Sequence, residues 1–323
     1  MPEKQRNNPL LQVENLKTWF PIRKGILART VGHVRAVDGV SFTLNKGETV
    51  GLVGESGCGK TTLGRTVLRL EDPTEGRILF KGRNLAALPQ RKLRPLRTEM
   101  QMIFQDPFSC LNPRLSVLDI VTEGIADHGL LETSREEAAA RLLGDVGLGT
   151  DAIYRYPHEF SGGQRQRISV ARAISLRPDF IVCDEAVSAL DVSVQAQVIN
   201  LLMDLRDKYN LAYLFIAHDL SVVQAIAHRI AVMYLGQIVE DGPADDVIET
   251  PLHPYTKALV SAIPVPGREE RDRIVLSGEV PSPANPPKAC RFHTRCPYVM
   301  DVCREEWPRP RTADGRSVCC HLY

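Results

Sequence analysis

The chain lacks several features that would point to broad classes of protein. No uncharged apolar stretch reaches the roughly 18 residues of a membrane-spanning helix. The polar N-terminus, MPEKQRNNPL, has no apolar core like that of a signal peptide. Forty Lys and Arg residues against 39 Asp and Glu residues give a formal net charge of +1, so the basic excess of a broad nucleic-acid-binding surface is missing. We therefore expect a soluble, cytosolic protein.

Length and composition fit an ordinary globular protein. With roughly 100–200 residues per domain, 323 residues leave room for about two domains. Hydrophobic residues make up 43% and charged residues 24%, which excludes general disorder and collagen-like repeats. From about Leu11 to Asp241, short apolar runs alternate with helical patterns, as in a mixed α/β domain. The predicted strands are Thr49–Val53, Met102–Phe104, Phe180–Cys183 and Leu211–Ile216, and the predicted helices include Glu136–Val146 and Val192–Asp207.

The strongest chemical motif is the run GESGCGKT at Gly54–Thr61, directly after the apolar run Val50–Val53. Such glycines let backbone N–H groups turn inward around phosphates, and the N-terminus of the following helix adds partial positive charge. Lys60 would reach the β- and γ-phosphates, and the Thr61 hydroxyl would bind Mg²⁺. The motif predicts a nucleotide site made of Gly54, Ser56, Gly57, Cys58, Gly59, Lys60, Thr61 and Thr62.

Two adjacent acids, Asp184 and Glu185, follow a predicted buried strand. They stand at its carboxyl end, where ligands bind in open α/β sheets. Asp184 would hold Mg²⁺ through water, and Glu185 would polarise the water that attacks the γ-phosphate. Taken alone, the two acids could equally cap a helix, but a preceding phosphate loop favours the catalytic interpretation.

A second predicted anion site lies at Ser161-Gly162-Gly163-Gln164. Ser161 is a good N-cap for a helix with Ile168, Ala171 and Ile174 on one face. One phosphate loop is enough for one nucleotide. The second site therefore predicts a nucleotide held by another subunit.

Together these motifs resemble the ATP-binding subunits of ABC transporters. The resemblance also rests on Phe160 before Ser161, on Ser188–Asp191, and on His218 after Phe215-Ile216-Ala217; it covers about Leu11 to Asp241. It implies an α/β P-loop ATPase domain of the ABC type at residues 1–242, with a helical subdomain at about 107–177. It further implies that two such domains bind head to tail, with each ATP between one P-loop and the opposite signature motif, Ser161–Gln164.

The resemblance assigns roles to single residues. Gln105 matches the glutamine that contacts Mg²⁺ and faces the membrane subunit. His218 matches the histidine that contacts the γ-phosphate, so Gln105 and His218 join Glu185 as catalytic residues. Asp191 matches the loop that crosses the dimer interface.

Members of the family also stack an aromatic ring on adenine. The candidates are Trp19 and Phe20, and Phe20 is favoured because it stands just before Pro21-Ile22-Arg23-Lys24. Either ring could instead fill the core beside an edge strand.

After residue 242 the amino-acid composition changes, and residues 243–323 are predicted to form a small, cysteine-rich C-terminal extension. Nine prolines lie between positions 243 and 287, which indicates a linker in which only His253–Ala262 is helical. The segment resembles the C-terminal extension of dipeptide and oligopeptide importer ATPases, including the related nickel and glutathione systems. This resemblance rests on His253–Thr256, Leu276–Pro283 and, for the second ATPase subunit of a dipeptide importer, a long loop at Pro21–Arg35.

Five of the eight cysteines crowd into the last 34 residues, which in a cytosolic chain favours metal binding over disulfides. The spacing lacks the paired C-x2-C of a typical structural zinc site, whereas four thiolates suit a [4Fe–4S] cluster. Some peptide-importer ATPases carry such a cluster here, and the resemblance selects Cys290, Cys296, Cys303 and Cys320, rather than Cys319, as ligands. Zinc and reduced structural cysteines are the alternatives. The inferred role is structural or redox-sensing.

The motifs and the extension together predict an ATP-hydrolysing subunit that powers import of di- or oligopeptides from the cytoplasmic face of the membrane. The implied partners are a second ABC ATPase subunit, expected to form a heterodimer, two membrane permease subunits and, indirectly, an extracytoplasmic binding protein. Nickel or glutathione import is the alternative. An ABC ATPase acting on DNA or ribosomes is disfavoured, because only 99 residues separate Thr61 from Ser161 and each motif occurs once.

Overall fold

The computed structural model describes residues 8–25, 28–263 and 274–323, which divide into two compact units. Unit 1 combines Met1–Asn45, Thr49–Ala87 and Ala217–Tyr323, and unit 2 combines Lys46–Glu48 with Leu88–Ile216. The C-terminal extension therefore shares a unit with the N-terminal strands.

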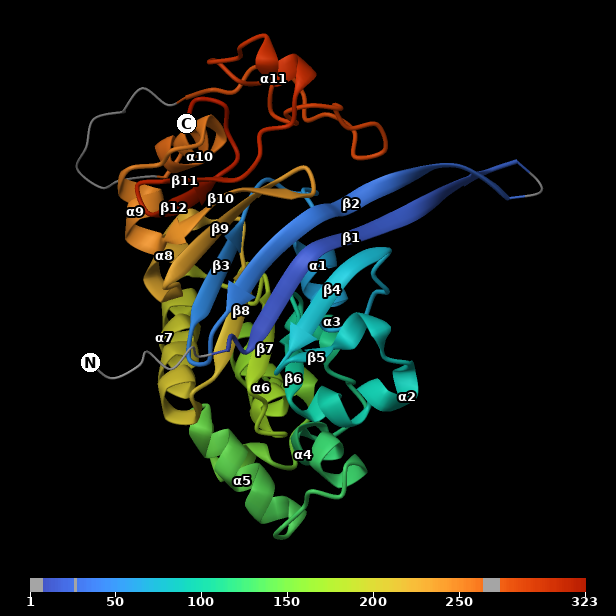
Figure 1. Cartoon of the computed structure of the whole chain (residues 1–323). Helices are drawn as coiled ribbons and strands as arrows, with labels where there is room; N and C mark the ends of the chain where they lie inside the picture. Colours follow the sequence, from blue (N-terminus) through green and yellow to red (C-terminus); the bar gives the residue numbers. More distant parts are fainter. Residues whose placement is uncertain (1–7, 26–27, 264–273) are drawn as a thin grey trace, which may run out of the picture. The chain divides into compact units, whose positions relative to one another are not determined.

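A long antiparallel hairpin opens unit 1. Strands β1 (Leu11–Lys24) and β2 (Arg29–Leu44) run side by side (Figure 1), paired from Leu11 opposite Leu44 to Lys24 opposite Arg29. The prediction of a long loop at Pro21–Arg35 is wrong, because Pro21 pairs with His33 inside the hairpin. On its other side β1 pairs with β4 (Glu75–Phe80), which in turn pairs with β5 (Arg83–Asn84).

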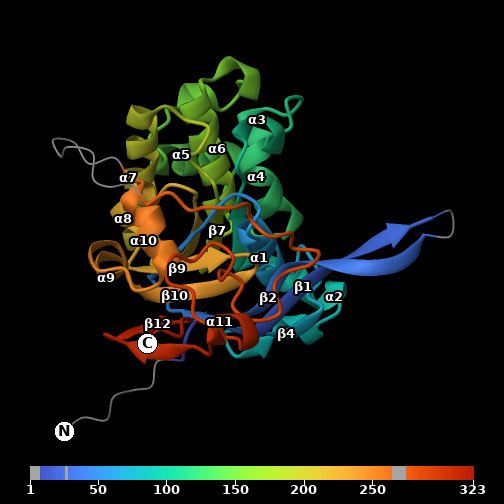
Figure 2. The same ribbon diagram turned by 90° about the horizontal axis from the view of Figure 1, so that it is seen from above.

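The other strands of unit 1 bring the two ends of the sequence together. Strand β3 (Thr49–Val53), wholly buried, runs parallel to β9 (Arg229–Tyr234), and β10 (Gln237–Pro243) continues antiparallel. Two short strands of the extension follow, since β12 (Arg316–Val318) pairs with β10 and with β11 (Arg311–Ala313). Figure 2 shows β12 beside β10 from above. The helices of unit 1 are α1 (Lys60–Val67), α8 (Leu220–Ile226), α9 (Ala244–Glu249), α10 (Pro254–Ser261) and α11 (Val302–Glu305).

Unit 2 contains three parallel strands and a group of helices. Strands β7 (Phe180–Asp184) and β8 (Ala212–Ile216) are completely buried, and β6 (Met100–Ile103) lies on the other side of β7. The helices are α2 (Gln90–Leu93), α3 (Pro107–Cys110), α4 (Val117–Asp127), α5 (Arg135–Asp145), α6 (Gly162–Ile174) and α7 (Val192–Tyr209). Helices α4, α5 and α6 pack on one another, and α6 also contacts α7 and β6. Within the described ranges of both units, no helix is long and apolar enough to cross a membrane.

A buried ion pair connects the extension to the rest of unit 1. The Arg316 side chain on β12 is 2% exposed, and its Nη1 lies 3.5 Å from Oε1 of Glu240, which is completely buried. The same nitrogen donates to the carbonyls of Asp246 (2.6 Å) and Thr250 (2.7 Å) at the end of α9. Glu240 accepts the backbone N–H groups of Leu252 and His253 just before α10. The Arg316–Glu240 pair thus connects β12, β10 and both ends of the α9–α10 connection.

We expect Arg316→Leu to lower the free energy of unfolding by about 3–5 kcal/mol, because Glu240 would stay buried without its cation. Urea denaturation followed by circular dichroism measures the loss. The exposed Arg309 offers a matched control, since Arg309→Leu removes the same group from the surface. Equal, small losses in both variants would contradict the structural role of the pair.

Candidate nucleotide-binding site

The P-loop of unit 1, Gly54–Thr61, is shaped by backbone contacts that exclude side chains. Gly54 has φ +155° and Gly59 has φ +109°. A Cβ atom on Gly54 would lie 2.1 Å from the Met233 carbonyl oxygen, and one on Gly59 would lie 2.0 Å from the Ala36 carbonyl oxygen. Only glycine fits at these two points, so the backbone can turn as tightly as a phosphate-binding loop requires.

Lys60 begins helix α1 and is 5% exposed. Its ammonium group donates to the carbonyls of Gly54 (2.7 Å) and Glu55 (3.1 Å), inside the curve of the loop. A phosphate oxygen at this place would compete with two neutral carbonyls for a full positive charge. Thr61 and Thr62 follow in the first turn of α1 and are partly exposed.

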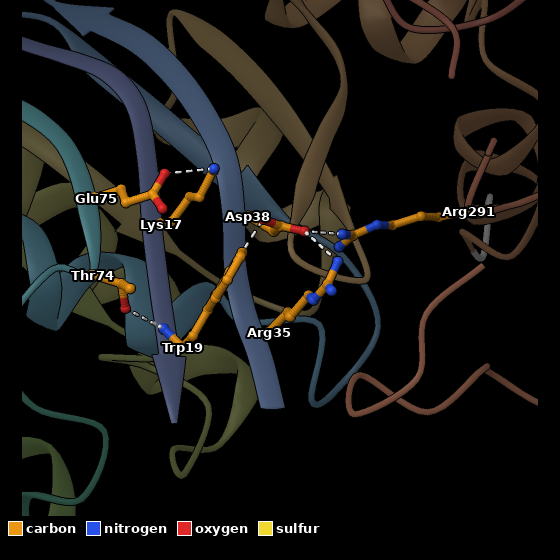
Figure 3. Close-up of polar contacts among 7 residues, drawn as sticks. All are labelled: Lys17, Trp19, Arg35, Asp38, Thr74, Glu75 and Arg291. Carbon is orange, nitrogen blue, oxygen red and sulfur yellow. Dashed lines mark hydrogen bonds and ion pairs between the residues drawn. The ribbon is translucent and has the colours of Figure 1, made fainter. Parts of the chain in front are cut away.

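The two adenine-stacking candidates are in different environments. The indole Nε1 of Trp19 donates to Asp38 (3.1 Å), and the Arg35 guanidinium lies 4.9 Å from the Trp19 ring centre. Figure 3 shows Arg35 and Arg291 converging on the same Asp38 carboxylate. Phe20 is 38% exposed, and adjacent side chains on a strand point to opposite faces. Phe20 is therefore the more exposed of the two rings, since Trp19 is partly buried.

His218 also belongs to unit 1. The backbone N–H of the preceding residue, Ala217, donates to the Leu52 carbonyl (3.2 Å) in β3, two residues before the P-loop. The His218 side chain is exposed. Helix α8 starts directly after it, with Asp219 as the N-cap that accepts the N–H of Ser221.

In unit 2, β7 ends in the two predicted acids. Asp184 is 3% exposed, whereas Glu185 is only half-buried and adopts φ +46°, which is uncommon for a residue with a side chain. The Glu185 backbone is fixed by its N–H donating to Ile216 (3.0 Å) and by Ser188 Oγ donating to its carbonyl (2.9 Å). Gln105 Nε2 donates to the Glu185 carboxylate (2.8 Å). Two residues predicted to be catalytic are thus in direct contact.

The signature motif of unit 2 lies at the exposed start of α6. Ser161 Oγ accepts the N–H of Gln164 (3.4 Å), and Gln164 Oε1 accepts the N–H of Ser161 (3.1 Å), which forms a capping box. A Cβ atom on Gly163 would lie 2.5 Å from Val194 Cγ1 on α7, so a glycine is needed for the two helices to approach. Asp191, the N-cap of α7, is exposed.

The metal prediction for the cysteine-rich extension has no support from the structure. Across residues 8–25, 28–263 and 274–323, no group of three or more His, Cys, Asp or Glu side chains is arranged to hold a metal ion. Burial, together with the neighbouring Cys303, Cys320 and Cys296 thiols, raises the pKa of Cys290 to about 11. Neither the [4Fe–4S] cluster nor the zinc alternative therefore has support from the described residues.

Three residues in contact at the P-loop were absent from the predicted site. Glu55, the second residue of the loop, bonds with Tyr255 of α10 and with Arg295 of the cysteine-rich segment. Neither partner belongs to a sequence motif for nucleotide binding. In the sequence, Tyr255 lies in the run His253–Thr256 and Arg295 stands directly before Cys296-Pro297, but neither position indicates a contact with the P-loop.

Known families match both parts of the chain. The family described as "ABC transporter" matches residues 37–188, and the family "Oligopeptide/dipeptide transporter, C-terminal region" matches residues 239–303. Among solved structures, cbiO1 of Clostridium perfringens, part of the ABC transporter complex cbiONQ, superposes with a TM-score of 0.65 at 23% identity, covering 75% of this chain and 92% of that one. The ATP-binding cassette MJ0796 superposes with a TM-score of 0.63 at 23% identity, covering 72% and 98%. These likenesses confirm the α/β fold of an ABC ATPase.

Curated relatives are similar over nearly the whole chain. The oligopeptide transport ATP-binding protein AppF of Bacillus subtilis is 54% identical over 320 residues, covering 97% of each chain. The probable peptide ABC transporter ATP-binding protein y4tS of Sinorhizobium fredii is 52% identical over 319 residues, covering 98% of this chain and 90% of y4tS. The chain therefore belongs to the family of ABC ATPases that are the ATP-binding proteins of peptide transporters.

Proposed function

We propose that this chain hydrolyses ATP to drive import of di- or oligopeptides through a membrane complex. The observation that carries the proposal is the union, in one unit, of a P-loop shaped for phosphates with a C-terminal region that matches the oligopeptide/dipeptide transporter family. Relatives named for oligopeptide or peptide transport support the substrate class. Nickel, glutathione, DNA and ribosomes have no such support.

The proposed chemistry depends on positioning and charge, as is usual for phosphoryl transfer. The N–H groups of the P-loop and the Lys60 ammonium would hold the β- and γ-phosphates. Glu185 would accept a proton from the attacking water, with its carboxylate oriented by Gln105, and His218 would contact the γ-phosphate. By the pattern of the family, Thr61, Gln105 and Asp184 would hold Mg²⁺, which would neutralise charge on the phosphates. Phe20 would stack on the adenine.

We propose that the site is completed by a second ABC ATPase subunit, in a heterodimer. The signature motif Ser161–Gln164 would bind the γ-phosphate of a nucleotide held by that subunit, with Asp191 at the interface. Support comes from exposure, because Ser161, Gln164 and Asp191 are all exposed and therefore accessible to a second subunit. Two permease subunits would receive the motion at the cytoplasmic face of the membrane, near Gln105.

We expect Glu185→Gln to keep ATP binding while hydrolysis falls about 10²–10⁴-fold, since only the proton acceptor is lost. Phosphate release and binding of a fluorescent ATP analogue, measured on the same preparation, separate the two effects. Glu249→Gln, at an exposed position on α9, is the matched control. Hydrolysis at the control rate would remove Glu185 from the mechanism.

Uptake tests the substrate class. Cells whose only copy of the chain carries Glu185→Gln should lose uptake of labelled dipeptides and longer peptides, because import would need the energy of hydrolysis. Uptake of Ni²⁺ in the same cells should stay normal. Loss of Ni²⁺ uptake with normal peptide uptake would instead assign the chain to metal import, and normal uptake of every substrate would refute the import proposal.

The iron–sulfur cluster stays a proposal from residue types alone. A single zinc ion needs its ligands about 2.3 Å from one point, whereas a [4Fe–4S] cluster spreads four thiolates over four irons. Cys290 interacts electrostatically with Cys296, Cys303 and Cys320, and these are the four proposed ligands. Anaerobically purified protein should contain about four iron and four acid-labile sulfide per chain, and Cys303→Ser should lose both. Stoichiometric zinc, or neither metal, would defeat the proposal.

A further inference from the structure

Glu55 connects the P-loop to two separate parts of the C-terminal extension. Its backbone N–H donates to the hydroxyl of Tyr255 on α10 (2.7 Å). Its carboxylate receives two bonds from Arg295, Nη1 to Oε2 (2.8 Å) and Nη2 to Oε1 (3.1 Å). Its carbonyl accepts from the Lys60 ammonium (3.1 Å). Each polar group of this residue therefore has a partner, and the partners of its N–H and of its carboxylate lie outside the loop.

Both outside partners are held firmly. Tyr255 is completely buried, and its ring meets that of Tyr234 edge-on at 4.8 Å and that of Phe292 at 5.6 Å. The Arg295 side chain is 8% exposed, with its guanidinium 6.0 Å from the Tyr234 ring centre. Tyr234 ends β9, the strand beside β3, which leads into the P-loop. A rigid aromatic cluster thus fixes the two groups that hold Glu55.

This arrangement has two physical consequences for nucleotide binding. A glycine-rich loop has many accessible conformations, and a bidentate arginine–carboxylate pair restricts one of its residues in both position and orientation. A carboxylate inside a phosphate-binding loop also repels the phosphates, and the Arg295 charge offsets that repulsion.

We propose that Arg295 and Tyr255 are positioning residues of the nucleotide site. They hold Glu55, so that the P-loop has its binding conformation and the Glu55 carboxylate is paired before ATP arrives. The C-terminal extension then sets the affinity for ATP without touching it. The proposal rests on the proposed function only in taking Gly54–Thr61 as the ATP-binding loop.

The test compares full-length variants in affinity for a fluorescent ATP analogue (mant-ATP) and in ATPase kinetics. Arg295→Gln should raise the Kd for mant-ATP and the KM for ATP about tenfold, with kcat within about twofold, because it unpairs a carboxylate beside the phosphates. Glu55→Gln combined with Arg295→Gln should recover to within about threefold of the unchanged protein, since two neutral amides can hydrogen-bond without charge. If Arg295 had a purely structural role, the double variant would bind mant-ATP no more tightly than Arg295→Gln alone. Arg304→Gln, exposed on α11, is the control and should change nothing.

Tyr255→Phe keeps the buried ring and removes one hydrogen bond, so it tests the positioning role even if Arg295→Gln fails to fold. We expect it to raise the Kd for mant-ATP about threefold. Unchanged affinity in Tyr255→Phe, or a double variant that gains nothing over Arg295→Gln, would overturn the proposal. These readouts do not involve peptide. If they behave as expected while peptide uptake survives Glu185→Gln, the import proposal fails and the positioning role stands.

Discussion

Holding a polyphosphate by backbone N–H groups requires a bare, tightly curved loop, and much of unit 1 is arranged around that requirement. The carbonyl oxygens of Met233 on β9 and Ala36 on β2 occupy the places where Cβ atoms of Gly54 and Gly59 would stand. The N–H of Gly236, in the turn after β9, donates to the Cys58 carbonyl (2.8 Å). The curve of the P-loop is therefore imposed by β2 and β9 as much as by its own glycines. This is why strand β2, from residues 29–44, and the strand pair β9–β10, from residues 229–243, must converge on one loop.

The C-terminal extension is built into this unit rather than attached to its surface. Strand β12 continues the hydrogen bonding of β10, and the Cys319 N–H donates to Val239 (2.8 Å) just beyond the last strand pair. Helix α10 contributes Tyr255 to the aromatic cluster under the P-loop. An extension that merely docked a partner would not need to supply strands and P-loop contacts. The proline- and cysteine-rich sequence of the extension does not indicate this integration, because its strands are short and pair with a strand far away in the sequence.

Sequence reasoning succeeded where the signal is local and failed where it is not. The strand predicted at Thr49–Val53 is confirmed as β3, and the predicted helix Val192–Asp207 is confirmed as α7, which runs to Tyr209 before Asn210 ends it with φ +53°. Apolar spacing and helix stop signals sufficed there. The outer part of the β1–β2 hairpin was missed, because its exposed, basic strands resemble a loop until the two are paired. The P-loop was visible as a motif, whereas the bond between Glu55 and Arg295 spans 240 residues and leaves no local pattern.

Three arginines of the extension share one feature that no single motif shows: each is buried and faces a carboxylate of the ATPase core. Arg291 pairs with Asp38, Arg295 with Glu55, and Arg316 with Glu240, and the three arginine side chains are 6%, 8% and 2% exposed. Breaking a buried pair by removing one member leaves an uncompensated charge, at about 3–5 kcal/mol, against a total stability of about 5–15 kcal/mol for a domain. Each pair therefore opposes detachment of the extension to an extent that depends on how buried its acid is: the Glu240, Asp38 and Glu55 side chains are 0%, 10% and 29% exposed. One of the three acids, Glu55, lies in the P-loop, and another, Asp38, also accepts a hydrogen bond from Trp19, next to the proposed adenine-stacking residue Phe20. The pairs that hold the extension therefore also contact the P-loop and the strand that carries Phe20.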